Sequence, residues 1–165
     1  MAVDKKEHLE KVLETHRMSH IEDLLKKSKS KRDDIKKALS DHYGDEIYSP
    51  FNSGSFKKHT AINIKFDLDV VAPFKRNSFD TLEKMFDDVY EFLFEKYKDE
   101  ATIKKQKVSI GLKFYADADG DEICVDVTPG RELNQDKYLE DDYINLYVNS
   151  KYGLIEEKSY LQTNI

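Results

Sequence analysis

The sequence predicts an α+β fold in which a mixed β-sheet packs against helices. Apolar residues recur at spacings of three and four in the first third of the chain and again after Ser78, which predicts helices. Most of the remaining sequence consists of short segments in which apolar and polar residues alternate, which predicts strands. The expected order is two helices, two strands, one helix and then mostly strands, an α+β layout.

Composition points to one folded domain. The chain has 165 residues, of which 39% are hydrophobic and 12% aromatic, and this is enough for a packed core. Its single cysteine excludes an internal disulfide. No apolar run approaches the roughly 20 residues of a membrane span. The charged N-terminus lacks the apolar region of a signal peptide. We therefore expect a soluble cytoplasmic protein with no membrane partner.

The charge of the chain argues against nucleic acid as a partner. The formal net charge is −6, so no overall basic field attracts phosphate backbones. A local basic run covers residues 26–37, but Asp33 and Asp34 interrupt it. A charge run on a helix is usually a solvated face, and we interpret this run in that way.

Residues 1–45 are expected to form a helical N-terminal part. Ser30 followed by Asp33 resembles a capping box, which predicts that a second helix starts there, and Gly44 is a plausible stop. The apolar stripe of the first helix consists of Leu9, Val12, Leu13, Ile21, Leu24 and Leu25. The inward face of the second consists of Ile35, Ala38, Leu39 and Tyr43.

Residues 46–165 are expected to form the sheet. Ser78 is the expected cap of a long helix that ends near Tyr97, and Pro73 is expected to end the strand before it. Asp119-Gly120 is a good hairpin turn between two strands. The predicted strands cover residues 46–49, 66–71, 107–115, 122–127 and 143–148.

Asp67 and Asp69 alternate with apolar residues in the stretch IKFDLDVV. On a strand, two residues separated by one lie roughly 6.5 to 7 Å apart on the same face. Like charges that close repel, and carboxylates next to a core are costly unless they are compensated. A divalent cation is the natural compensation, and Mg²⁺ prefers oxygen ligands of this kind.

A third carboxylate, Asp126, lies on the polar face of the apolar segment ICVDVTPG. If its strand lies beside that of Asp67 and Asp69, three carboxylates converge on one patch. Such a patch suits two metal ions about 3.5 to 4 Å apart, the arrangement used for in-line phosphoryl chemistry. Asp126 is then placed to bind a metal or to accept the proton of an attacking hydroxyl.

Gly54 and Ser55 precede Asp67 by a segment of eleven residues. Without a Cβ, Gly54 lets backbone N–H groups approach a phosphate closely, and Ser55 adds a hydroxyl donor. The residues that follow can begin a helical turn, whose N-terminus favours anions. Lys57 and Lys58 carry positive charge that suits the same phosphates, although ordinary surface positions would also explain them.

Together these motifs resemble the nucleotidyltransferases of the DNA polymerase beta superfamily. The resemblance rests on Gly54-Ser55, the spaced Asp67-Leu-Asp69 and the later Asp126. Thr60-Ala-Ile and the DVTPG segment narrow it to the branch of oligoadenylate synthetase and cyclic GMP-AMP synthase. Within that branch it resembles especially the bacterial cyclic-oligonucleotide synthases of anti-phage defence. It runs from about residue 35 to the C-terminus, where YLQTN resembles the last strand of the family's core.

The resemblance implies the transfer of a nucleoside monophosphate from a nucleoside triphosphate, ATP or GTP, to a ribose hydroxyl. It implies Mg²⁺ or Mn²⁺ as cofactor and a regulatory protein or downstream effector as a further partner. By position, the catalytic and metal-binding residues are Asp67, Asp69 and Asp126. The expected substrate-binding residues are Gly54, Ser55, Lys58 and Thr60.

Two departures from the family pattern bear on this expectation. Asn52-Ser53 stands before the Gly-Ser pair, where many relatives have a glutamine or another small turn residue. Relatives also continue into a helical second domain, whereas this sequence stops at Ile165. We therefore expect residues 1–165 to be the nucleotidyltransferase core alone, as a fragment or a reduced member with its metal residues intact.

Two other functions remain open from the sequence. A minimal nucleotidyltransferase could adenylylate a partner protein, as in some toxin–antitoxin pairs, and the short length favours this. A non-catalytic nucleotide-binding module is the other alternative. We interpret His16 and His20 as surface residues, because a third metal ligand is missing from that pattern. The sequence DADGD at residues 117–121 has its glycine in the wrong place for a calcium loop, and we interpret it as a turn.

Overall fold

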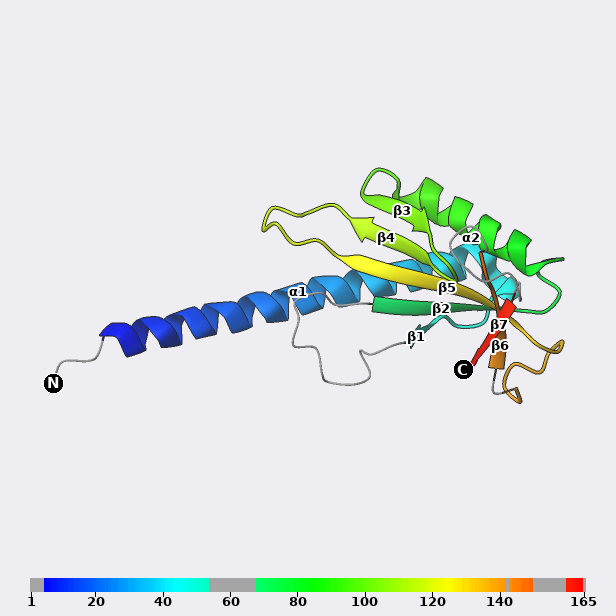
Figure 1. The fold of residues 1–165 in the computed structure, drawn as a ribbon, viewed down its shortest axis with the longest axis horizontal. Coiled ribbons are helices and arrows are strands. Elements are labelled where there is room, and N and C mark those ends of the chain that lie inside the picture. Colours follow the sequence, from blue (N-terminus) through cyan, green and yellow to red (C-terminus); the bar gives the residue numbers. More distant parts are fainter. Residues whose placement is uncertain (1–4, 54–67, 142, 150–159, 165) are drawn as a thin grey trace.

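A computed structural model describes residues 5–53, 68–141, 143–149 and 160–164 of the chain, and Figure 1 shows them as a ribbon. The α+β prediction is confirmed: one sheet packs against two helices. The elements are α1 (Lys5–Tyr43), the short 3₁₀ helix η1 (Gly44–Glu46), β1 (Phe51–Ser53), β2 (Leu68–Phe74), α2 (Leu82–Tyr97), β3 (Ala101–Lys105), β4 (Ile110–Phe114), β5 (Cys124–Glu132), β6 (Tyr143–Tyr147) and β7 (Tyr160–Asn164).

The sheet is mixed and is built around β5. Five strands follow the order β1-β2-β5-β4-β3, and among the described strands only β2 and β5 pair in parallel. One edge of β5 pairs with β2 along its length. The other edge pairs first with β4 and then, from Gly130 to Glu132, with β6, which in turn pairs with β7. The strand β5 therefore connects the two halves of the sheet.

Both helices cover one face of the sheet. Figure 1 shows α2 lying along the β3 side, while α1 runs past β2 and extends beyond the sheet. Ile35 and Leu39 of α1 and Phe86 and Leu93 of α2 are fully buried in the main core. Alternate residues of β2, β3 and β4, and Val125 and Val127 of β5, join this core, as the alternation of side chains along a strand requires. The opposite face of the sheet is therefore the one on which polar residues are presented.

A smaller apolar cluster lies on that opposite face. Val71 of β2 packs there with Ile144 and Leu146 of β6, and Phe51 and Tyr138 lie against it. A Cβ on Gly130 would overlap Ile144 Cδ1 and lie 3.1 Å from Leu146 Cδ2. The absence of a side chain at Gly130 thus lets β6 close over this end of the sheet, while the end that carries Asp69 and Asp126 has no such cover from β6.

The prediction of two N-terminal helices is wrong, because α1 continues without a break from Lys5 to Tyr43. The proposed cap at Ser30 lies inside the helix, since no glycine or proline interrupts residues 5–43 and the buried face continues through Ser28 and Ile35. The predicted apolar stripe is also only partly buried: Leu9, Val12 and Ile21 are exposed. Gly44 does end the helix, with a φ of 52° that suits glycine.

Three strand boundaries differ from prediction. The chain around 46–49 is not a strand: η1 ends at Glu46, Ile47 forms an isolated bridge with Phe74, and β1 follows later. The strand β2 runs through Pro73 instead of ending before it. Pro73 lies beyond the residues that pair with β1, and its carbonyl accepts a bond from the Tyr48 N–H at 2.7 Å. β5 extends to Glu132, well past the predicted end.

The helix α2 begins later than expected, and one strand was missed. Thr81 is the N-cap, with its side chain accepting from the Lys84 N–H, whereas Ser78 donates to the Glu46 carbonyl. The missed strand is β3, whose residues ATIKK alternate in burial. It forms a hairpin with β4, which is shorter than the predicted strand at 107–115. The Asp119-Gly120 turn, β6 and the final strand β7 are found where the sequence placed them.

No helix among the described residues combines the length and the apolar character needed to cross a bilayer.

Candidate functional site

The site is built on two neighbouring parallel strands. Asp69 of β2 and Asp126 of β5 are register partners, and both are half-buried. The residues on either side of each aspartate are buried in the main core or beside it. Since register partners on adjacent strands point to the same face, the two carboxylates lie side by side on the face opposite the helices. The two strands are therefore adjacent, as the predicted shared site requires.

The same row of residues continues across the sheet in both directions. Ser53, the last residue of β1, lies opposite Asp69, and Gly111 of β4 lies opposite Asp126. Lys104 of β3 lies opposite Gly111 and is exposed. The row therefore crosses five strands and places an acidic pair between a small residue on one side and a lysine on the other.

Ser53 immediately precedes the expected phosphate-binding pair in the sequence. Because Ser53 is the register partner of Asp69, the described part of the chain ends directly beside that aspartate. Gly54, Ser55, Lys58, Thr60 and Asp67 themselves lie outside the described residues. Their predicted roles, and the convergence of three carboxylates, stay predictions.

The donors that are described suit a hard divalent cation. Two carboxylates on adjacent strands, about 4.8 Å apart at the backbone, supply oxygen ligands and a local negative charge. Both side chains are only partly accessible, which strengthens their mutual electrostatic interaction relative to bulk water. Among the described residues of this face, Asp69 and Asp126 therefore offer the carboxylate oxygens that a divalent cation would need.

Lys113 and Cys124 lie on the same face of the sheet as Asp126. Lys113 of β4 pairs with Glu122 at 2.9 Å, and this bond raises the pKa of the lysine. Cys124 is half-buried and, at two residues from Asp126, shares its face. Thr128 follows on the same face of β5.

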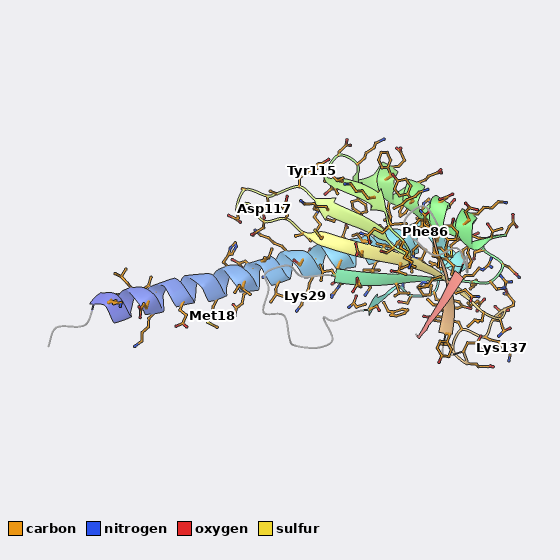
Figure 2. All side chains as sticks on the ribbon, viewed as in Figure 1. Met18, Lys29, Phe86, Tyr115, Asp117 and Lys137 are labelled. Atoms are coloured by element: carbon orange, nitrogen blue, oxygen red, sulfur yellow. The ribbon has the colours of Figure 1, made fainter. Side chains whose placement is uncertain are left out.

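A second acidic group lies at the tip of the β4–β5 hairpin, where Figure 2 labels Asp117. Within the described ranges, Asp117, Asp119 and Asp121 are the one set of three acidic side chains close enough to share an ion. The ammonium of Lys27, from α1, already lies among them at 2.6, 2.7 and 3.5 Å. Hydrogen bonds to Asp117 and Asp119 raise the pKa of Lys27.

This second group is structural. His20, as expected a surface residue, lies 3.1 Å from Asp121, so α1 holds the hairpin through two side chains. The Asp117 carboxylate also accepts the N–H groups of Asp119 and Asp121, which shapes the turn. The interpretation of residues 117–121 as a turn agrees with the structure. The gathering of three carboxylates around Lys27 was not expected from sequence.

Sequence reasoning also missed a residue that touches the acidic pair. The side-chain amide of Gln106, in the turn between β3 and β4, donates to Asp126 Oδ1 at 3.2 Å. A glycine inside a strand pattern signals a close approach of other groups, and Gly111 carries that signal. The signal marks the place but does not identify Gln106 as the residue that fills it.

Comparisons with known proteins show the same fold in solved structures. No protein-family profile matches the sequence, and no curated protein matches it significantly. The CdnE cyclic dinucleotide synthase of Elizabethkingia meningoseptica, solved with GTP and Apcpp, matches with a TM-score of 0.57 and 17% identity, over 82% of this chain and 47% of that one. CdnC of Escherichia coli MS115-1, solved with ATP, matches with a TM-score of 0.54 and 20% identity, over 89% and 43%.

A third similar structure is the CdnE c-UMP-AMP synthase of Rhodothermus marinus, solved with Apcpp and Upnpp. It has a TM-score of 0.52 and 18% identity, over 83% of this chain and 51% of that one. The chain spans about half the length of these proteins or less. At this level of identity the likeness establishes the fold: the chain has the nucleotidyltransferase-core fold of bacterial cyclic dinucleotide synthases.

Proposed function

We propose that this chain is the catalytic core of a metal-dependent nucleotidyltransferase. It transfers a nucleoside monophosphate from a nucleoside triphosphate to a ribose hydroxyl and makes a cyclic di- or oligonucleotide signal, with anti-phage defence as its setting. The observation that carries the proposal is the pairing of Asp69 with Asp126 on adjacent parallel strands, in a fold shared with cyclic dinucleotide synthases. The acidic pair lies on the sheet face opposite the two helices.

In the proposed reaction, the ribose oxygen forms a bond to the α-phosphorus while the bond between the α- and β-phosphates breaks. Pyrophosphate leaves, and the hydroxyl proton passes to the Asp126 carboxylate. Asp67, Asp69 and Asp126 are the proposed ligands of Mg²⁺ or Mn²⁺. When bound, such a cation neutralises phosphate charge and acidifies the attacking hydroxyl.

The triphosphate has a proposed binding segment beside the acidic pair. Ser53 lies opposite Asp69, so a phosphate held by Gly54 and Ser55 would be within reach of the carboxylates and their cation. Lys58 and Thr60 are proposed to contribute further phosphate contacts. ATP and GTP are the proposed substrates, supported by the GTP, ATP and Apcpp present in the similar structures.

Turnover of labelled nucleotide tests the proposal. The chain is incubated with α-³²P-labelled ATP, the other ribonucleoside triphosphates and Mg²⁺ or Mn²⁺, and the products are separated. We expect a new labelled nucleotide together with pyrophosphate, and we expect Asp69→Asn to abolish both. The matched control is Asp119→Asn, which changes an exposed aspartate of the Lys27 cluster and should retain activity.

The position of the label decides among the functions. Label in a small molecule supports nucleotide synthesis, and label in a protein supports the adenylylation of a partner. Nucleotide binding without turnover, measured by calorimetry, supports a binding module. Product formation that survives in both Asp69→Asn and Asp126→Asn would contradict the assignment of the site.

A further inference from the structure

The environment of Asp126 contains a group that the proposed reaction does not use. Gln106 lies between β3 and β4, and its Nε2 donates to Asp126 Oδ1 at 3.2 Å. The two residues are twenty positions apart in sequence and meet because β4 pairs with β5 at this level. An amide that donates to a carboxylate oxygen restricts the rotation of the carboxylate.

The amide of Gln106 is itself held in place. Ser109 Oγ donates to its Oε1 at 2.8 Å, and the Gln106 backbone N–H donates to the Ser109 carbonyl at 2.8 Å. Ser109 is buried, with 8% of its surface exposed, so its hydroxyl is a fixed anchor. Because the carbonyl end of the amide is engaged by Ser109, the NH₂ end is directed at Asp126.

A glycine provides the space that the amide occupies. Gly111 is the register partner of Asp126, and a Cβ built on it would overlap Gln106 Nε2 and lie 3.2 Å from Asp126 Oδ1. Glycine weakens a strand interior, so its presence here has a cost for β4. At this position a side chain would displace the amide from the carboxylate.

We propose that Gln106 is a positioning residue: its amide, anchored by Ser109 and admitted by Gly111, orients the Asp126 carboxylate toward a bound divalent cation. This inference rests on the proposed function, because it assumes that Asp126 is a metal ligand. Hydrogen bonds from outside the ligand set orient metal-binding carboxylates, and their loss typically lowers metal affinity or activity by about 10- to 100-fold.

Binding of Mn²⁺ alone, followed by the electron paramagnetic resonance signal of unbound Mn²⁺, tests this without relying on turnover. Gln106→Met keeps the length of the side chain and removes the amide. We expect its dissociation constant for Mn²⁺ to rise about tenfold. Because Gln106 is exposed, thermal unfolding should stay close to wild type, which separates positioning from a structural role. Gln135→Met, at an exposed glutamine of the β5–β6 loop, is the matched control and should bind as wild type.

Gly111→Ala provides a second route to the same loss. Its methyl group should push the amide away and weaken Mn²⁺ binding to a similar extent. In the double variant Gly111→Ala with Gln106→Ala, the effects of the two changes on Mn²⁺ affinity should not be additive, because the amide that the methyl group displaces is already absent.

The outcomes separate the two proposals. If Asp126→Asn weakens Mn²⁺ binding while Gln106→Met and Gly111→Ala do not, the positioning role is wrong and the metal site stands. If the wild-type chain binds no Mn²⁺, or Asp126→Asn binds as well as wild type, both the metal site and the positioning role are overturned.

Discussion

Removing one of the two paired carboxylates should stabilise the metal-free protein. Asp69 and Asp126 lie on adjacent strands in register and are half-buried. Two unit charges about 5 Å apart repel by about 1 kcal/mol in bulk water and by about 3 kcal/mol at the effective dielectric constant of about 20 typical near protein surfaces. Asp126→Asn keeps an oxygen that accepts the Gln106 bond and removes the charge. We therefore expect the free energy of unfolding to rise by about 1 to 3 kcal/mol.

The assay is urea unfolding at low ionic strength with EDTA, repeated with increasing Mn²⁺. In EDTA the variant should have the higher unfolding midpoint with the same dependence on urea. Mn²⁺ should reverse the order, because a ligand at about 1,000 times its dissociation constant stabilises the protein that binds it by about 4.1 kcal/mol. The wild-type protein should gain this, and Asp126→Asn should not.

Asp99→Asn is the control for general charge effects, since Asp99 is exposed between α2 and β3. It should change neither the midpoint in EDTA nor the response to Mn²⁺. The reasoning is refuted if Asp126→Asn is less stable than wild type in EDTA. It is equally refuted if both proteins gain the same stability from Mn²⁺.

Three further expectations follow from contacts elsewhere. Gly130→Ala should lower the free energy of unfolding in urea by about 1 to 3 kcal/mol, because its methyl group overpacks against Ile144. The double variant with Ile144→Val, which lacks the overlapping methyl group, should lose less than the sum of the two single losses. Lys27→Met should raise the pKa of Asp117, measured by carboxyl ¹³C NMR, because the Lys27 bond lowers that pKa below 3.8 in the folded protein. The wild-type protein should therefore be more stable than the variant above pH 3.8, and this difference should shrink as the pH falls below 3.8. Tyr48→Phe should cost about 1 kcal/mol of stability, because it removes the hydrogen bond from the Tyr48 hydroxyl to Glu132, the buried last residue of β5. Burial and that bond raise the pKa of Tyr48 to about 12. Wild-type stability should therefore fall as the pH rises from 10 to 12, and the fall should be smaller in the variant.

The sequence was most informative for features that a few neighbouring residues determine, such as the two-residue alternation of a strand. Alternation alone placed Asp69 and Asp126 on the polar faces of their strands, and the structure pairs them. Local turn chemistry likewise located Asp119-Gly120 and the end of α1 at Gly44. In these cases the information is contained in a few neighbouring residues.

Features that depend on distant contacts were not predictable in this way. The capping signal at Ser30 is overridden because the helix packs on the sheet on both sides of it. β3 is short and rich in lysine, so its pattern is weak without the partner β4. The bond from Gln106 to Asp126 exists only because a turn brings the amide back over Gly111. A single sequence shows each residue but not the pairing that joins them.

The helix α1 combines two environments in one unbroken element. Every described side chain from Lys6 to Asp23 is exposed, whereas Leu24, Ile35 and Leu39 are buried against the sheet. A helical segment whose side chains are exposed is only marginally stable in water. Backbone amides before Leu24 should therefore exchange with deuterium through local fraying, while those beyond it should exchange only when the sheet opens. Cooperative protection along this helix should begin about where Lys27 reaches the hairpin.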